Sequence, residues 1–173
     1  MSHDCEMKIR AECKADEQAV FEVNAATFPT LAEANIVEAL RKGASPVLSL
    51  VAECGGKIVA HIMFSPMTVP GESETKIMGL APVAVVPEVQ RSGVGKALVE
   101  AGLESCRRLG IHAVVVLGHP EYYPKFGFVP ASRYGIRCEY DVPDEAFMAL
   151  ELVPGALRGI SGTVRYHEAF GGV

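Results

Sequence analysis

The sequence predicts an α/β fold with a mixed, mostly antiparallel sheet in which one pair of strands is parallel. Two runs rich in β-branched and aromatic residues, 47–52 and 57–69, are joined by a Gly-Gly turn, a pattern typical of an antiparallel hairpin. Farther along, a strand over 77–86, an apolar helical stripe and the run AVVVL at 113–117 follow one another. A strand–helix–strand crossover connects parallel strands, so we expect the strands over 77–86 and 113–117 to be parallel.

The N-terminal part of the chain predicts one strand followed by two helices. The run MKIRA at 7–11 is short and partly alternating, as expected of a strand. Asp16 can cap a helix whose apolar residues recur at helical spacing and which ends before Pro29. A second helix is predicted from about Leu31 to Lys42, because apolar residues again share one face and a glycine follows.

Length and composition limit the classes of protein that fit. With 173 residues the chain has the size of about one domain, so we expect a single domain over 1–173. The net charge of −5 disfavours binding to nucleic acid, which needs a basic face. The longest charge-free stretch, 58–71, contains prolines and is shorter than the ~18 residues of a membrane span, so no membrane partner is expected.

The cysteines and the N-terminus predict a cytoplasmic protein. The first ten residues lack the apolar segment of a secretion signal. Five cysteines are scattered without a C-x-x-C pair, so we expect reduced thiols. No metal site is expected, because no Cys/His cluster has the spacing of ligands. His61 lies in an apolar strand, which is typical of a core histidine with satisfied hydrogen bonds.

Two further features concern the sheet. Pro82 lies inside the strand over 77–86 and cannot donate a hydrogen bond to a neighbouring strand, which predicts a bulge or a local parting of strands. In the C-terminal part, 146–152 and 162–166 are predicted to be strands among turns.

The most informative segment for function is QRSGVGK at 90–96, between the proline-containing strand and the helix that follows. Glycines at such a turn let the backbone approach a ligand closely. The unpaired amides of the first helical turn carry a partial positive charge and bind anions. Arg91 and Lys96 add positive side chains, so the segment predicts a cradle for a diphosphate.

Three alternatives exist for this turn. A P-loop would need a glycine where Gln90 stands and a hydroxyl where Ala97 stands. A dinucleotide-binding turn would need a small residue where Leu98 stands, and a parallel sheet before it. In the third alternative the glycines shape the turn and bind nothing.

The string [QR]-x-x-G-x-[GA] at 90–95 resembles the coenzyme A-binding turn of the GNAT superfamily, the acetyl-CoA-dependent N-acetyltransferases. The preceding LAPVAVVP at 80–87 is similar to the family's fourth strand, and YYPKFGF at 122–128 is similar to its terminal Y-x-x-x-G-F. The tail over 148–167 resembles a bacterial subgroup of these acetyltransferases. The resemblance covers nearly the whole chain and is most specific over 79–128.

The resemblance implies a GNAT-like domain in which the parallel strands splay apart and the pantetheine arm of acetyl-CoA fills the gap. Acetyl-CoA would be the cosubstrate, and no metal would be required. The family pattern assigns the pantetheine amides to the backbone of Val83, Ala84 and Val85. It assigns the pyrophosphate to the backbone amides of Arg91, Ser92, Gly93, Val94, Gly95 and Lys96.

The family reaction is direct attack of an amine on the thioester. Tyr123 stands at the general-acid position, four residues before Gly127, with a packing role as its alternative, and Tyr122 is expected to be a packing residue. The strand over 77–86 carries no Asp or Glu, so Glu33 is the first candidate for the base and His119 the second. A surface glutamate, an exposed loop histidine and a water chain to solvent are the alternatives.

The sequence therefore predicts transfer of an acetyl group from acetyl-CoA to a primary amine of a small molecule or peptide. The alternative is a non-catalytic acyl-CoA-binding sensor or scaffold module. Members of the family often dimerise, which makes a homodimer one expected assembly. The loop over 118–121 is shorter than in many relatives and lacks the asparagine they carry, so the resemblance does not carry their usual side-chain contact to the cofactor over to this chain.

Overall fold

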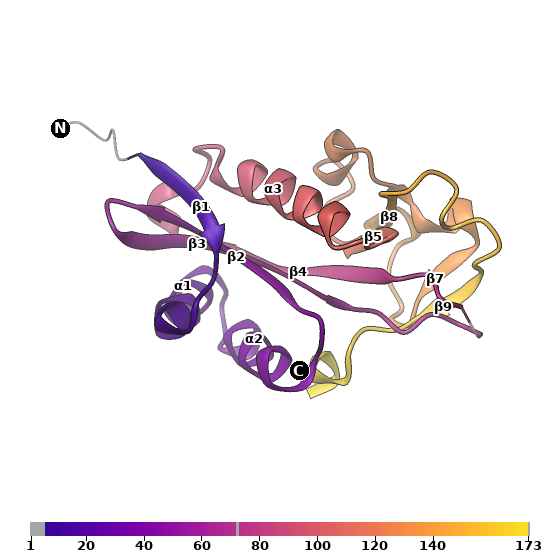
Figure 1. Ribbon diagram of the computed structural model, residues 1–173, viewed down its shortest axis with the longest axis horizontal. Coiled ribbons are helices and arrows are strands. Elements are labelled where there is room, and N and C mark those ends of the chain that lie inside the picture. Colours follow the sequence, from indigo (N-terminus) through magenta and orange to yellow (C-terminus); the bar gives the residue numbers. More distant parts are fainter. Residues whose placement is uncertain (1–5, 72, 173) are drawn as a thin grey trace.

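A mixed sheet forms the centre of the molecule (Figure 1). The computed structural model describes residues 6–71 and 73–172. Within them, seven strands are arranged in the order β1-β2-β3-β4-β5-β8-β6, and β7 pairs with β9 in a separate two-stranded parallel sheet. The strands are β1 (Met7–Ala11), β2 (Leu48–Cys54), β3 (Lys57–Pro66), β4 (Ile77–Val85), β5 (Ala113–Leu117), β6 (Val129–Pro130), β7 (Ile136–Cys138), β8 (Phe147–Glu151) and β9 (Gly162–Val164).

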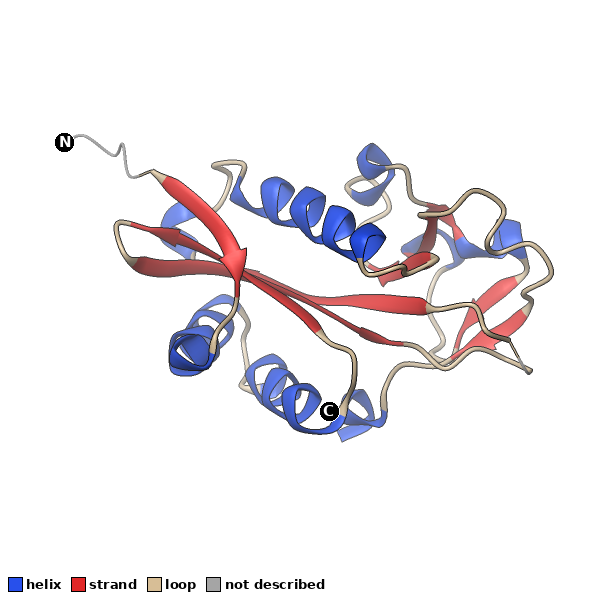
Figure 2. Cartoon of the chain, in the orientation of Figure 1, coloured by secondary structure: helices blue, strands red, loops and turns tan. Residues whose placement is uncertain are grey.

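Helices cover both faces of the sheet, as the secondary-structure colouring makes clear (Figure 2). Helix α3 (Val94–Arg108) lies on one face, and α1 (Glu17–Thr27) and α2 (Ala32–Gly43) lie on the other. The described residues also form the short 3-10 turns η1 (Lys14–Asp16), η2 (Pro87–Val89), η3 (Tyr123–Phe126), η4 (Ala131–Tyr134), η5 (Asp144–Ala146) and η6 (Glu168–Gly172). None of the helices in this part of the chain is both long and apolar enough to cross a membrane.

The predicted fold class is confirmed. β2 and β3 form the expected antiparallel hairpin, and β4 and β5 are parallel. The strand predicted over 146–152 is β8, which pairs with β5. Only the first three residues of the strand predicted over 162–166 belong to β9.

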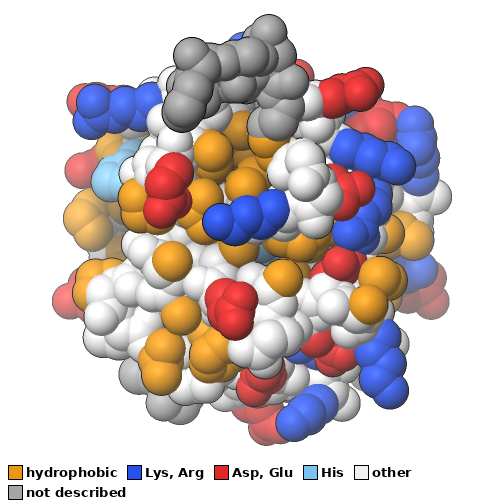
Figure 3. Space-filling model, turned by 90° about the vertical axis from the view of Figure 1, so that its left-hand side faces the viewer, with side chains coloured by type: hydrophobic (Ala, Val, Ile, Leu, Met, Phe, Trp, Pro, Cys, Tyr) orange, Lys and Arg blue, Asp and Glu red, His pale blue; other side chains and the backbone are white. Residues whose placement is uncertain are grey.

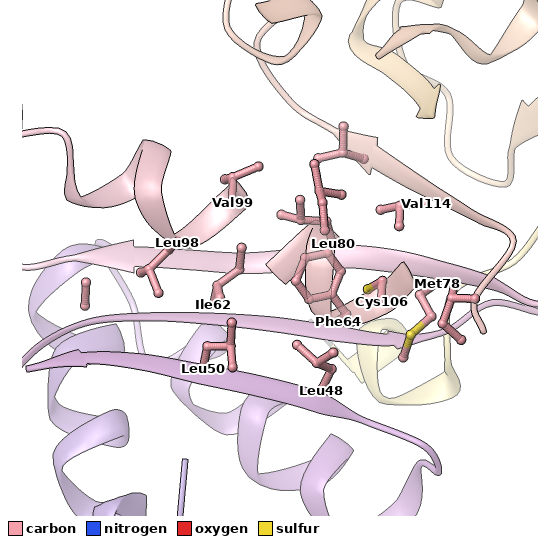
Figure 4. Packing of buried hydrophobic residues seen from close by; sticks show 14 of the residues in the cluster. Leu48, Leu50, Ile62, Phe64, Met78, Leu80, Leu98, Val99, Cys106 and Val114 are labelled. Atoms are coloured by element: carbon pink, nitrogen blue, oxygen red, sulfur yellow. The ribbon is translucent and has the colours of Figure 1, made fainter. Parts of the chain in front are cut away.

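The larger core lies between the sheet and α3. Figure 4 shows Leu98 and Val99 of α3 against Ile62 and Phe64 of β3 and Leu80 of β4, all of which are buried. The helix can cover these strands because its apolar residues recur every three or four positions, and Ala60, Ile62 and Phe64, every second residue of β3, face it. The other face of β3 is also buried. This packing orients the N-terminus of α3 toward the end of β4.

Asp16 does not act as the predicted helix cap. It precedes α1, but its side chain makes no capping hydrogen bond. The carboxylate accepts two hydrogen bonds from Arg10, at 2.7 and 3.0 Å, and one from the backbone of Cys13 at 2.8 Å. These donors hold the pKa of Asp16 well below its usual range, because they stabilise the ionised carboxylate.

The expectation that all five cysteines are reduced thiols is wrong, because Cys54 is disulfide-bonded. Cys13, Cys106 and Cys138 carry free thiols. Cys5 lies outside the described residues.

His61 on β3 is fully buried in a chain of hydrogen bonds, as predicted for a core histidine. Ser49 donates its hydroxyl proton to Glu12 over 2.7 Å, so the same hydroxyl accepts from His61 Nε2 over 2.8 Å. Nδ1 is then the bare nitrogen and accepts from the Asn24 amide over 3.1 Å. Arg41 pairs with Glu12 at 2.6 Å and closes the network.

We expect His61 to make the stability of the fold fall in mild acid. Burial lowers the pKa of His61 to about 3, below the ~6.5 of an unfolded histidine. Between these values the unfolded chain binds a proton that the folded chain excludes, so the free energy of unfolding decreases as the pH falls. At pH 5.0 this group alone should lower it by about 2 kcal/mol relative to pH 7.5.

Urea denaturation at the two pH values measures this change. His61→Gln should lose that part of the pH dependence, whereas His119→Gln, at an exposed histidine, should keep it. An equal pH dependence in wild type and His61→Gln would contradict the assignment.

Candidate functional site

The parallel strands β4 and β5 part after three paired positions. Their pairing ends at Gly79 and Val115, although β4 continues to Val85 and β5 to Leu117. We call the opening between these unpaired ends the splay. On the other side of β4, Ala81 and Pro82 lie opposite the single residue Met63 of β3, where the register shifts. The proline is therefore at a bulge and the neighbouring strands part, as its position in the sequence predicts.

The backbone of β4 alternates between β3 and the splay. The Val86 amide donates to the Val59 carbonyl at 3.0 Å, so Val86 faces β3. In an antiparallel ladder every second residue faces the same partner, which directs the backbone of Ala84 to β3. The backbones of Val83 and Val85 are directed away from β3, into the splay. The register therefore favours Val83 and Val85 over Ala84 as partners of a ligand.

The Val85 carbonyl, one of the backbone groups directed into the splay, already has protein partners. The Val85 carbonyl accepts from the Gln90 side-chain amide at 2.9 Å and lies 3.1 Å from the Thr27 hydroxyl, which shares its one proton with the Val23 carbonyl at 2.8 Å. Thr27 ends α1 and Gln90 begins the glycine-rich turn. These bonds hold both segments at the open end of the splay.

The N-terminus of α3 has no side-chain cap. Gly93 is the residue before the helix and has φ +90°, a left-handed conformation that favours glycine, with open space where a side chain would begin. The Ser92 hydroxyl donates to the Val89 carbonyl and does not cap the helix. The first helical hydrogen bond is donated by Ala97, which leaves the amides before it without an intrahelical acceptor. This geometry suits an anion.

The residues predicted to hold a pyrophosphate form one continuous turn at the end of β4. Arg91 also has a positive φ, of 64°, which is uncommon for a residue with a side chain and bends the loop toward the helix. Figure 3 looks onto this end of the molecule, where hydrophobic side chains lie among Lys, Arg, Asp and Glu. Within the turn, which consists of Arg91, Ser92, Gly93, Val94, Gly95 and Lys96, the exposed side chains of Arg91 and Lys96 carry positive charge.

Tyr123 lies across the splay from this turn, at the start of η3 after β5. Its ring fills the space beside Gly118, where a Cβ would lie 2.5 Å from the ring. Edge-to-face contacts with Tyr122 and Phe128, at centroid distances of 5.0 and 5.7 Å, fix the ring. Burial, and secondarily Tyr122, raises the pKa of Tyr123 to about 12, so the phenol keeps its proton at neutral pH and acts as a donor.

The environment of Gly118 shows why this position of the loop after β5 has no asparagine side chain. Because the Tyr123 ring occupies the place of a side chain at 118, an asparagine there would displace the ring. The segment after β5 is correspondingly compact and contains only the 3-10 turn η3 before Gly127.

Tyr122, which the sequence suggested only as a packing residue, also reaches the helix. A Cβ on Gly95 would lie 3.7 Å from the Tyr122 hydroxyl and 3.7 Å from Val85. The Lys125 ammonium lies 4.3 Å from the centre of its ring. Tyr122 also lines an open cavity of about 540 Å³ together with His119, Pro120 and Glu121. Two adjacent tyrosines in a sequence do not indicate which of them lies against α3.

The two candidate bases occupy different places. Glu33 is in the first turn of α2, and its Oε1 is buried without a hydrogen-bond partner. His119 is exposed, and its backbone carbonyl accepts from the amides of Tyr122 and Tyr123 at 3.1 and 3.4 Å. Among the described residues no hydrogen bond or ion pair links Glu33, His119 and Tyr123, so the structure does not bring them together as one hydrogen-bonded group.

The described ranges, 6–71 and 73–172, contain no group of three or more His, Cys, Asp or Glu side chains that could hold a metal ion. The polar side chains that the structure places at the open end of the splay are Thr27 and Gln90, which contact the Val85 carbonyl, and Tyr122, whose hydroxyl lies beside Gly95.

A family model, curated relatives and solved structures that match this chain are all described as acetyltransferases. A family model described as "Acetyltransferase (GNAT) domain" matches residues 8–131. The N-acetyltransferase YhbS of Escherichia coli K12 is 36% identical over 165 residues, covering 95% of this chain and 98% of YhbS. The crystal structure of E. coli YhbS in complex with CoA has a TM-score of 0.91 at 35% identity and covers 99% of this chain and 95% of that one. A GNAT family acetyltransferase of Brucella melitensis, in complex with acetyl-CoA, has a TM-score of 0.79 at 34% identity, covering 98% and 99%.

Proposed function

The chain belongs to the GNAT family of acetyltransferases, and from this premise we propose that it transfers the acetyl group of acetyl-CoA to a primary amine of a small molecule or peptide. The observation that carries the proposal is the splay, whose open end adjoins an uncapped helix N-terminus. An extended arm can pair with the free edge of β4 while its diphosphate meets the helix. The cytoplasmic location and the single domain over 1–173 remain predictions.

We assign the cofactor contacts to the backbone. The register supports Val83 and Val85 as partners of the pantetheine amides, with Ala84 between them directed to β3. The amides of the turn over 91–96 would hold the diphosphate. Acetyl-CoA supplies the activated acyl group as a thioester.

Glu33 is the proposed general base. An alkylamine with a pKa near 10 is almost fully protonated at pH 7, so it must lose a proton before it can attack. A buried carboxylate oxygen without a partner is unfavourable unless a ligand satisfies it. The Glu33 Oε1 atom has this environment, which supports a contact to the incoming amine. His119 and a water chain to solvent are the alternatives, but the exposed imidazole makes no hydrogen bond within the described chain.

Tyr123 is proposed to assist the departure of the thiol. A phenol of pKa about 12 would lose roughly 5 kcal/mol by giving its proton fully to a thiolate of pKa ~8.5. A hydrogen bond from Tyr123 to the sulfur has no such penalty and stabilises the charge that develops there. We therefore infer that Tyr123 donates a hydrogen bond and keeps its proton.

The proposed activity predicts that the purified protein releases CoA from acetyl-CoA when an amine is added. Tyr123→Phe should lower kcat by about 10²-fold, because one aligned donor to a developing charge has roughly this effect. The measurement is thiol release over a panel of amines, with Tyr134→Phe as the control outside the splay. Tight CoA binding without release above background would support the sensor alternative.

Gly93→Asp and Gly95→Asp should weaken CoA binding at least tenfold. At Gly93 the side chain strains a backbone with φ +90°, and at either site the carboxylate repels a diphosphate near the helix tip. Isothermal titration with CoA measures the effect. The matched control is Gly159→Asp, at a glycine with φ +83° and open space around it, which imposes the same strain and charge elsewhere. An unchanged affinity for CoA in Gly93→Asp and Gly95→Asp would contradict the assignment of the diphosphate to the turn over 91–96.

Glu33→Gln should lower the rate about 10²-fold at pH 7, a typical value for losing a general base. The difference from wild type should narrow as the pH approaches 10, because the amine then deprotonates in solution. The pH profile of kcat/KM for the amine measures this. Glu38→Gln, on the same helix, is the control and should follow wild type throughout. A constant difference at every pH would argue for a structural role of Glu33.

A further inference from the structure

The closed end of the splay, where the pairing of β4 and β5 stops, is the end that an acyl group on CoA would reach. The turn over 91–96 follows the C-terminal end of β4. An arm that starts at this turn and runs along the free edge of β4 passes Val85 first and approaches Gly79 last. The thioester is at the end of the arm that is remote from the diphosphate. The space around Gly79 therefore decides how large an acyl group the splay can hold.

Two sides of this closed end are filled by the sheet and by the core under α3. In the plane of the sheet, the pairing of Gly79 with Val115 closes the gap between β4 and β5. On the face toward α3, Leu80 and Val114 are buried in the larger core (Figure 4). An acyl chain can therefore extend only toward the opposite face of the sheet.

On that opposite face, two side chains fill the space over Gly79. A Cβ on Gly79 would lie 2.8 Å from the Met67 sulfur and 2.9 Å from the Tyr166 ring, closer than Cβ atoms come to other groups. Gly79 is not among the residues with positive φ, so glycine is needed here for space and not for its conformation. Its cross-strand partner Ser65 is also small. Both large side chains can thus lie directly on the strands where the splay begins.

A short β-bridge from the C-terminal segment positions these two side chains. Thr68 and Arg165 pair in antiparallel fashion, with backbone hydrogen bonds of 2.8 and 3.0 Å. At the next position Met67 lies opposite Tyr166, and residues that lie opposite each other project to the same side. The Tyr166 amide also donates to the Glu139 carboxylate at 2.8 Å. The backbone therefore fixes where the ring and the thioether lie.

Packing keeps the Tyr166 ring in place. Its centroid is 5.9 Å from that of Tyr140 and 5.2 Å from that of Phe170. Tyr166 is 9% exposed and Met67 is 8% exposed, and both belong to the same core cluster. Close-packed side chains do not move aside without disturbing their neighbours. An acyl group that needs more room meets these side chains as a steric barrier.

We propose that Tyr166 and Met67 form a wall at the closed end of the splay that limits the acyl group to acetyl and excludes butyryl and longer chains. The assignment rests on the proposed function, which places acetyl-CoA in the splay, and it adds the acyl selectivity of that site. The ring carbons of Tyr166 lie over Gly79, so the selectivity depends on the ring and not on the hydroxyl.

The test compares acetyl-CoA with butyryl-CoA. Release of CoA with the amine that is turned over fastest gives kcat/KM, and isothermal titration gives the affinity for each thioester. We expect kcat/KM to be at least tenfold lower for butyryl-CoA, because one extra methylene group in a closed pocket already has an effect of about tenfold or more. The affinity for butyryl-CoA should be lower as well. Equal rates and equal affinities in the wild type would overturn the proposal.

Variants locate the effect. Tyr166→Ala should raise kcat/KM for butyryl-CoA relative to acetyl-CoA about tenfold, and Met67→Ala should change this ratio in the same direction. Tyr166→Phe keeps the ring and should keep the wild-type ratio. Leu157→Ala is the matched control, because it truncates a buried side chain of the same cluster that does not lie over Gly79. Its ratio should be that of the wild type.

Thermal melting verifies that each variant is folded. If Tyr166→Ala does not fold, Tyr166→Leu, which also removes the ring, replaces it. A wild-type ratio in the folded Tyr166 variant and in Met67→Ala would contradict the wall.

The outcomes separate the two claims. If no amine is turned over, but acetyl-CoA binds more tightly than butyryl-CoA and Tyr166→Ala removes this preference, the wall stands and the proposed function fails. If amines are turned over and the variants keep the wild-type acyl preference, the acetyltransferase function stands and the wall is overturned. An effect of Tyr166→Ala on KM for the amine alone would assign the ring to the acceptor and would also overturn the wall.

Discussion

Beyond Gly79, β4 has a hydrogen-bonding neighbour on one side only, and the other features of the site depend on this unpaired edge. Backbone groups left without partners in a protein interior are costly, at about 1–3 kcal/mol each. Part of this cost is offset at the Val85 carbonyl, which accepts from the Gln90 side chain and shares the Thr27 hydroxyl proton with the Val23 carbonyl. The remaining edge is available to a ligand with amides of its own. The bulge at Ala81 and Pro82 lies where the strands part.

The two sides of the splay contribute different chemistry. On the β4 side, the segment that follows the strand contains Gly93, which has a left-handed conformation, and the uncapped start of α3. The amides there provide a fixed partial positive charge. On the β5 side, the segment that follows the strand contains Tyr122 and Tyr123, whose rings pack edge to face. Tyr123 lies against Gly118, and the hydroxyl of Tyr122 lies near Gly95. The buried phenol keeps its proton because ionisation would be unfavourable there, which favours donation over proton removal.

The face opposite α3 has another character. Its polar groups include two buried atoms without partners, Ser65 Oγ and Glu33 Oε1, and the ring of Tyr166 stacks there on that of Tyr140. By contrast, the His61 network beneath α1 is almost fully paired and serves stability. Within that network the Asn24 amide oxygen has no hydrogen-bond partner, so unpaired buried polar atoms occur in the core as well as at Ser65 and Glu33.

The sequence by itself determined the features that depend on local periodicity and local chemistry. These include the antiparallel hairpin, the parallel pair β4 and β5, the irregularity at Pro82 and the glycine turn before α3, because side-chain alternation and backbone freedom act over a few residues. Only the tertiary structure decided which of two adjacent tyrosines reaches α3, that the backbone of Ala84 faces β3, and that Asp16 binds Arg10 instead of capping α1. Each of these depends on the packing of segments distant in the chain, which no pattern in a short stretch of residues specifies.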